Sequence, residues 1–142
     1  MNYQIRELHT LEEMLSCYDL IKELYNWLSA EKYQLRLEAM IPNHYFQIAV
    51  FDGDQCVGLS GIWIGTKIYS SKYLEMDNVV VDEKYRSKGI GKLLVDAAEA
   101  KAKAEGCRTM MLDAYVENHA AHKFYFREGF VVKGFHFLKK LS

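Results

Sequence analysis

The sequence predicts a mixed α/β fold in which helices flank one central sheet. Short apolar or alternating runs, typical of strands, are interspersed with longer runs whose apolar residues recur at helical spacing. In chain order the expected elements read β-α-α-β-β-β-α-β-α-β-β. With 142 residues and no linker, repeat or low-complexity tract, the chain is expected to form one domain over residues 1–142.

The N-terminal part is expected to hold a strand and two helices. Residues 3–8 are predicted to form the strand. Thr10 can cap the first helix, with Glu13 three positions later as its capping-box partner. Apolar residues recur at helical spacing from there to Leu28. A second helix is predicted over Lys32–Met40. It is expected to stop before Pro42, because the residue that precedes a proline disfavours the helical conformation.

Three strands are expected in the middle of the chain. The first two cover about 45–51 and 55–64 and are joined by Asp52-Gly53-Asp54, a hairpin signal. The next strand runs over about 73–81. The helix that follows it is expected to end near Gly106, because glycine is a favourable C-cap.

The C-terminal part is predicted to contain a strand over 107–113, a helix over 118–127 and a final hairpin divided by Gly134.

Bulk composition excludes several classes of protein. The 18 basic and 19 acidic residues give a net charge of −1, which provides no general attraction to nucleic acid or membrane surfaces. No apolar run is long enough to span a membrane, and the N-terminus lacks the apolar core of a secretory signal. Cys17, Cys56 and Cys107 have no disulfide or metal-site spacing, so no metal and a cytoplasmic location with reduced thiols are expected.

The segment from Arg86 to Lys92 is interpreted as a pyrophosphate cradle. It leads from the apolar run Val79-Val80-Val81 into an amphipathic helix. The first amides of a helix lack intrahelical acceptors and carry partial positive charge. Gly89 and Gly91 have no Cβ atoms, so a phosphate oxygen can approach the backbone closely. Formal positive charge comes from Arg86, Lys88 and Lys92.

Two familiar phosphate-binding motifs do not fit this segment. The chain contains no Gly-x-x-x-x-Gly-Lys-Ser/Thr run. A dinucleotide fingerprint would need a third glycine, where Leu94 stands, and an acidic residue about twenty positions further on, where the chain reads Met110-Met111-Leu112.

A second motif indicates which pyrophosphate-bearing ligand the segment from Arg86 to Lys92 would bind. The chain reads Asn118-His-Ala-Ala-His-Lys-Phe-Tyr-Phe-Arg-Glu-Gly-Phe130 in and after the later helix. Together with Arg86-x-x-Gly-x-Gly91, this run resembles the GNAT superfamily, the GCN5-related N-acetyltransferases that use acetyl-CoA. The order of elements along nearly the whole chain also matches that superfamily.

The resemblance implies a specific fold and a co-substrate. The fold is a central, mostly antiparallel twisted sheet with a splayed fourth and fifth strand, flanked by about four helices. The co-substrate is acetyl-CoA, with no metal. Backbone groups of the fourth strand would bind the pantetheine arm, and the glycine-containing loop would bind the pyrophosphate. The implied cofactor-binding residues are Val79, Val80, Val81, Arg86, Ser87, Lys88, Gly89, Ile90, Gly91, Lys92, Asn118, Ala121 and Tyr125.

Some of these residues have an equally ordinary structural interpretation. Lys92 can be a solvated helix residue, and Asn118 can be the N-cap of the helix over 118–127. Val79, Val80 and Val81 are also suited to a buried strand.

The resemblance assigns Tyr125 as the general acid that protonates the departing thiolate, a role that suits a phenol. Asp77 is the first candidate for the base. Period-two alternation places it on the same strand face as Val79. Glu75, one step further along that face, is the second candidate, and ordered water is the third. The carbonyl oxygen would be polarised by a backbone N–H near Val79.

The expected activity is acetyl transfer to a primary amine of a small molecule or peptide by direct attack. Tyr25, Trp27, Tyr33, Glu23 and Glu31 lie where the superfamily places its acceptor, and aromatic and acidic side chains suit a cationic amine. The alternative is a non-catalytic module that senses acyl-CoA. A homodimer through the C-terminal strand Phe135–Leu138 also stays open.

Overall fold

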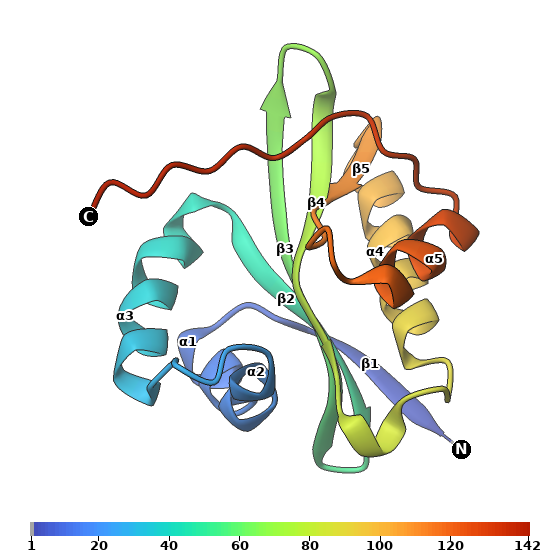
Figure 1. The fold of residues 1–142 in the computed structure, drawn as a ribbon. Helices are drawn as coiled ribbons and strands as arrows, with labels where there is room; N and C mark the ends of the chain where they lie inside the picture. The colour runs from blue at the N-terminus through green and yellow to red at the C-terminus, as the bar shows by residue number, and fades with distance from the viewer. Residues whose placement is uncertain (1) are drawn as a thin grey trace.

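The computed structural model describes residues 2–142 and forms a five-stranded sheet with helices on both faces (Figure 1). The strands lie in chain order, β1-β2-β3-β4-β5. All neighbours are antiparallel except β4 and β5, which are parallel. The strands are β1 (Tyr3–Leu8), β2 (Tyr45–Asp52), β3 (Gln55–Lys67), β4 (Ser71–Val81) and β5 (Thr109–Leu112).

Two groups of helices cover the sheet. The first three lie together on one side, and the last two lie on the other (Figure 1). The first group is α1 (Leu11–Leu15), α2 (Tyr18–Leu24) and α3 (Ala30–Met40), and the second is α4 (Ile90–Ala104) and α5 (His119–Arg127). Two short 3₁₀ helices, η1 (Ile41–Asn43) and η2 (Glu83–Tyr85), complete the list.

Helix α4 packs directly on the centre of the sheet. It buries Ile90, Leu94 and Val95, whose spacing places them on one helical face. Gly58 of β3 makes this approach possible, because a Cβ atom there would overlap Cγ2 of Ile90. The N-terminal end of α4 is therefore fixed against the sheet, close to the end of β4.

The first helix begins as expected but ends early. Oγ1 of Thr10 accepts a hydrogen bond from the Glu13 amide, and the Glu13 carboxylate accepts one from the Thr10 amide, which confirms the capping box. The predicted continuous helix to Leu28 is wrong. The Cys17 amide donates to the Met14 carbonyl in a tightened turn, and α2 starts afresh at Tyr18.

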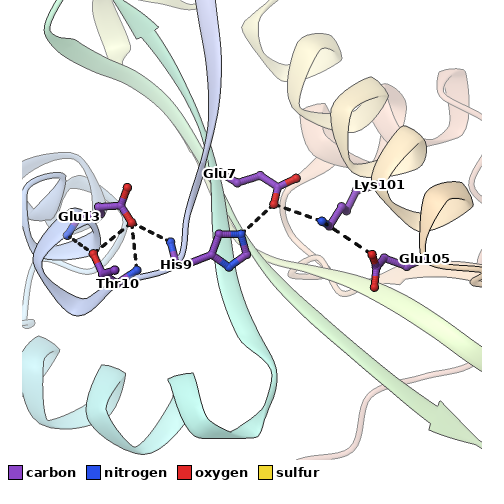
Figure 2. A network of polar contacts seen from close by, with 6 residues as sticks. All are labelled: Glu7, His9, Thr10, Glu13, Lys101 and Glu105. Atoms are coloured by element: carbon purple, nitrogen blue, oxygen red, sulfur yellow. Dashed lines mark hydrogen bonds and ion pairs between the residues drawn. The ribbon is translucent and has the colours of Figure 1, made fainter.

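A polar cluster ties β1 to the C-terminal half of α4. Figure 2 shows the Glu7 carboxylate between His9 and Lys101, with Glu105 on the other side of the lysine. Nε2 of His9 lies 2.8 Å from Oε1 of Glu7, and Nζ of Lys101 lies 3.2 Å from the same oxygen. Hydrogen bonds from His9 and Lys101 outweigh the effect of burial and lower the pKa of Glu7. This cluster lies at the opposite end of α4 from the predicted cradle.

The predicted C-terminal hairpin is wrong. No strand follows α5, and residues beyond 129 run as an extended segment across the sheet (Figure 1). Their large apolar side chains are uncovered, with Phe135 81% and Phe137 92% exposed. Strand β5, the neighbouring edge, has only four residues, so it offers few ladder groups to an added strand.

Candidate active site

Strands β4 and β5 pair over four residues and then separate. Their parallel register runs from Tyr73 opposite Thr109 to Met76 opposite Leu112. Strand β4 continues through residues 77–81, which pair only with β3. The other backbone edge of residues 77–81 therefore has no strand partner among residues 2–142. This confirms the splayed pair of strands and leaves main-chain groups available to an extended ligand.

A bulge lies in β4 where the strands begin to separate. The register with β3 shifts between Leu59 and Gly61, so two β4 residues, Asn78 and Val79, face a single β3 residue. Asn78 takes a positive φ of 53° to accommodate the extra residue. The predicted alternation that placed Asp77 and Val79 on one face is therefore wrong, because the bulge interrupts it between these two positions.

The loop before α4 presents a series of free amides. The first backbone bond into the helix runs from the Leu93 amide to the Gly89 carbonyl. Within residues 2–142, the amides of residues 87–92 donate to no protein acceptor. Ser87 and Gly89 adopt positive φ values of 64° and 82°, and a Cβ atom on Gly89 would meet nothing within 4 Å. The loop is thus an open run of donors at the positive end of α4.

Gly91 has a packing role in addition to the one expected of it. A Cβ atom there would lie 3.3 Å from Cζ of Phe124, so the glycine lets α5 approach the first turn of α4. Lys92 pairs with Asp96 and with Glu128, and these hydrogen bonds and charges raise its pKa. These contacts favour the interpretation of Lys92 as an ordinary helix residue.

Helix α5 carries Tyr125 on its inner side. The Tyr125 ring packs edge-on against Phe124 and Phe130, with ring centroids 5.2 Å and 5.8 Å away. Its hydroxyl makes no hydrogen bond to any residue that the structure describes, and burial raises its pKa. Oδ1 of Asn118 accepts a hydrogen bond from the Ala121 amide at 3.2 Å, so Asn118 is the N-cap of α5.

The two predicted carboxylates lie on the other face of β4 from α4. Asp77 pairs with Gly61 and Glu75 with Trp63, so their side chains share one face. Oδ1 of Asp77 accepts a hydrogen bond from the Asn78 amide at 2.8 Å. Glu75 is half-buried, and burial together with the carboxylates of Asp113 and Asp77 raises its pKa.

A chain of hydrogen-bonded side chains lies beside these carboxylates, and no sequence motif predicted it. Nε2 of Gln47 donates to the hydroxyls of Tyr33 and Tyr45, at 2.8 Å and 3.1 Å. The Tyr45 hydroxyl donates to Oδ1 of Asn78, and Nδ2 of Asn78 donates to the Tyr25 hydroxyl, each at 3.0 Å. The only signal available in the sequence was the density of tyrosines, because the chain connects four elements distant in sequence.

The same tyrosines line a cavity of about 260 Å³ next to the bulge. Its polar and aromatic lining consists of Tyr25, Trp27, Tyr33, Arg36, Tyr45 and Asn78. The predicted acceptor residues Tyr25, Trp27 and Tyr33 are thus brought together, whereas the exposed Glu23 and Glu31 do not line the cavity.

A larger hollow of about 670 Å³ is lined in part by Lys101 and Glu105, and Tyr45 lines both this hollow and the smaller cavity. Lys101 is three turns along α4 from the cradle, roughly 16 Å from Ile90. The part of the hollow at Lys101 is therefore remote from the cradle.

Other features of the described chain do not indicate additional chemistry. No group of three or more His, Cys, Asp or Glu side chains in residues 2–142 is arranged to hold a metal ion. None of the helices described is both long and apolar enough to cross a membrane.

Comparison with known proteins identifies the family. Residues 8–130 match the acetyltransferase (GNAT) family. This chain belongs to that family.

Relatives and solved structures agree with the GNAT assignment. The chain is 29% identical to the uncharacterized N-acetyltransferase YhdJ of Bacillus subtilis, covering 95% of this chain and 96% of that protein. It is also 29% identical to the aminoalkylphosphonate N-acetyltransferase of Salmonella typhimurium, covering 93% and 88%. The fold resembles that of the aminoglycoside N-acetyltransferase AAC(6')-Iy in complex with CoA, with a TM-score of 0.86, 20% identity and coverage of 99% and 96%.

Membership of the GNAT family identifies acetyl-CoA as the co-substrate, and the geometry fits such a molecule. The free amides of residues 87–92 suit a diphosphate, and the unpaired edge of residues 77–81 suits an amide-containing arm. Gly89 leaves open space above the loop.

Proposed function

We propose that this protein transfers the acetyl group of acetyl-CoA to a primary amine of a small molecule or peptide by direct attack. Three features of the structure support the proposal together. These are the unpaired edge of residues 77–81, the free amides of residues 87–92 and the unpartnered hydroxyl of Tyr125.

The co-substrate would be held mainly by the main chain. Backbone groups of Val79 and Val81 bind the pantetheine arm, with Val80 buried between them. The amides from Ser87 to Gly91 hold the pyrophosphate, assisted by the charges of Arg86 and Lys88. Lys92, Asn118 and Ala121 support this surface through their contacts in α4 and α5.

The reaction needs one proton acceptor and one proton donor. The amine nitrogen forms a bond to the thioester carbonyl carbon, and the carbon–sulfur bond breaks with its electron pair on sulfur. Asp77 takes the proton that the amine loses, directly or through water, with Glu75 as the second candidate. Tyr125 gives its phenolic proton to the thiolate, and its raised pKa keeps that proton in place at neutral pH. A backbone N–H near the bulge stabilises the developing oxyanion.

Small acceptors are supported by the size of the cavity. Its volume of about 260 Å³ lies below the roughly 300–1,000 Å³ typical of pockets for drug-sized ligands. The similarity to an aminoalkylphosphonate N-acetyltransferase also favours a small aliphatic amine. A cationic acceptor would instead bind Glu75 and Asp77, whose side chains share the face of β4 that points away from α4.

A non-catalytic acyl-CoA sensor is the alternative function. The two are separated by mixing the purified protein with acetyl-CoA and a panel of amines and following release of free thiol. Release that depends on one class of amine and falls in Tyr125→Phe supports the enzyme. Saturable binding of acetyl-CoA without release on any amine supports the sensor.

We also propose that two copies associate through the C-terminal segment 130–142. In one chain this segment leaves Phe135 and Phe137 uncovered, and β5 is an edge strand with one partner. An extended segment with uncovered apolar side chains suits exchange between two copies, in which each copy covers the segment of the other. The occupant proposed is therefore a second copy of this chain.

A further inference from the structure

Among residues 2–142, the charge at the wall of the cavity beside the bulge is positive. Arg36 is its only charged lining residue within residues 2–142, and no carboxylate lines it. The guanidinium carbon of Arg36 lies 4.9 Å from the Trp27 ring centroid, so the side chain stacks on the indole at the cavity wall. Arg36 forms no ion pair with any side chain described in the structure.

The hydroxyls of Tyr25 and Tyr33 in the cavity donate no hydrogen bond to any residue that the structure describes. The Tyr33 hydroxyl accepts from Nε2 of Gln47, and the Tyr25 hydroxyl accepts from Nδ2 of Asn78. Neither hydroxyl donates to an acceptor in the described chain. Both can therefore donate to a ligand that enters the cavity.

The direction of these hydrogen bonds is set by Gln47 beneath the cavity. Gln47 is fully buried, and its Oε1 atom is the one buried side-chain atom without a partner in residues 2–142. If Nε2 and Oε1 of Gln47 exchanged places, the two N–H donors of Nε2 would be buried without acceptors. This would cost more free energy than leaving the single acceptor Oε1 unpaired. The orientation that frees the Tyr25 and Tyr33 hydrogens is thus the favoured one.

The amine-accepting chemistry lies at one side of this cavity. Asn78 lines it, and its amide donates to Asp77. Asp77 directly precedes Asn78 in β4, and its Oδ1 atom lies 2.8 Å from the Asn78 amide nitrogen, so the carboxylate lies close to the cavity. The Asp77 carboxylate therefore lies beside the cavity where β4 borders it. The Arg36 guanidinium and the hydroxyls of Tyr25 and Tyr33 line the cavity wall.

We infer that the acceptor is a small amine that also carries an anionic group, such as a phosphonate, phosphate or carboxylate. The anionic group binds Arg36 and the hydroxyls of Tyr25 and Tyr33, and the amino group points toward Asp77 at the bulge. Arginine suits this role because its planar fork matches the oxygens of such anions. This inference rests on the proposed acetyltransferase function and specifies its acceptor.

The first test compares amines of similar length with different second groups. The set is 2-aminoethylphosphonate, β-alanine, propylamine and 1,3-diaminopropane, with thiol release as the readout. We expect the two anionic amines to have the highest kcat/KM. Arg36→Met keeps an aliphatic stem against Trp27 and should lower kcat/KM for them about 10- to 100-fold, while leaving propylamine within about twofold.

Two control variants separate charge from structure. Arg36→Lys should recover part of the preference for anionic amines. Lys32→Met, on the same helix and outside the cavity lining, should leave all four amines unchanged. A preference for propylamine or 1,3-diaminopropane that is unaffected by Arg36→Met would overturn the inference and leave the proposed function intact.

A second test is independent of turnover. Calorimetric titration with methylphosphonate should show saturable binding to the wild type and a loss of at least tenfold in Arg36→Met. If no amine is acetylated, the proposed function fails, and methylphosphonate binding still decides whether the cavity holds an anion. Equal binding by the two proteins, or none by either, would contradict the anionic site.

Discussion

The indole Nε1 of Trp63 donates a hydrogen bond to Oδ2 of Asp77 over 3.0 Å. With the Asn78 amide on the other oxygen, this bond fixes the carboxylate in one orientation beside the bulge. The Trp63 ring packs at a tilt against Tyr45, with ring centroids 4.8 Å apart and an interplanar angle of 54°, so Trp63 connects the predicted base to the hydrogen-bonded tyrosines. Trp63 is therefore a positioning residue for Asp77.

Replacing Trp63 by phenylalanine removes the indole donor and keeps an aromatic ring. We expect kcat to fall about tenfold, because the Asp77 carboxylate loses one of its two hydrogen bonds, while KM for acetyl-CoA stays within about twofold. Steady-state kinetics with each substrate varied in turn measure both quantities. If kcat falls equally in Asp77→Asn and in the double variant Trp63→Phe/Asp77→Asn, Trp63 acts through Asp77. Additive losses of kcat in the double variant would refute this role.

Stability should depend on pH through Glu75. Burial and two neighbouring carboxylates raise its pKa above the ordinary value of 4.5, so the folded protein binds this proton more tightly than the unfolded chain does. Ionising Glu75 therefore costs stability as pH rises through and above 4.5. Glu75→Gln should raise Tm at pH 7 relative to wild type and bring little or no gain below pH 4.

Thermal melts across that range supply the comparison, with Glu31→Gln on the exposed side of α3 as the control. A Tm difference between Glu75→Gln and wild type that is the same at every pH would show that Glu75 does not titrate as described.

The two glycines of the cradle should respond differently to alanine. Gly89 has a φ of 82°, so Gly89→Ala strains the loop by about 1 to 2 kcal/mol and shifts its amides, raising KM for acetyl-CoA at least tenfold. In Gly91→Ala the added Cβ approaches Phe124 at 3.3 Å, so the main loss is in stability. Calorimetric titration with CoA and chemical denaturation separate the two effects. The same change in CoA affinity in both variants would contradict the distinction.

The C-terminal segment should control the oligomeric state. Phe135→Asp combined with Phe137→Asp places charges where two copies are proposed to meet, so the mass should fall from that of a dimer to that of a monomer. Light scattering coupled to size exclusion gives the mass directly. Lys139→Asp with Lys140→Asp changes charge in the same segment without removing apolar area and serves as the control. A monomeric wild type would refute the proposed dimer.

How much the sequence predicted depends on how local each feature is. The Thr10 capping box, the Asp52-Gly53-Asp54 hairpin and the loop from Arg86 to Gly91 depend on residues close together in the chain, and each was found in the structure as expected. The break at Cys17 was not predictable from apolar spacing, because helical periodicity continues through it.

Long-range features were beyond the reach of sequence patterns. The bulge at Asn78 interrupts the alternation of side chains between the two faces of β4. It depends on the pairing register with β3, which cannot be read from the local sequence. The hydrogen-bonded chain from Gln47 through Tyr45 to Tyr25 connects residues up to 53 positions apart. The C-terminal hairpin was predicted around Gly134, but a local turn signal does not reveal whether the residues on either side of it pair as strands.

The most direct test of the account is the joint measurement of acetyl-CoA binding and amine-dependent thiol release in wild type and Tyr125→Phe. Both proteins should bind acetyl-CoA with similar affinity. Because Tyr125→Phe removes the phenolic proton donor, kcat should fall about a hundredfold or more. Unchanged kcat in Tyr125→Phe would remove Tyr125 from the mechanism, and absence of acetyl-CoA binding to the wild type would contradict the account as a whole.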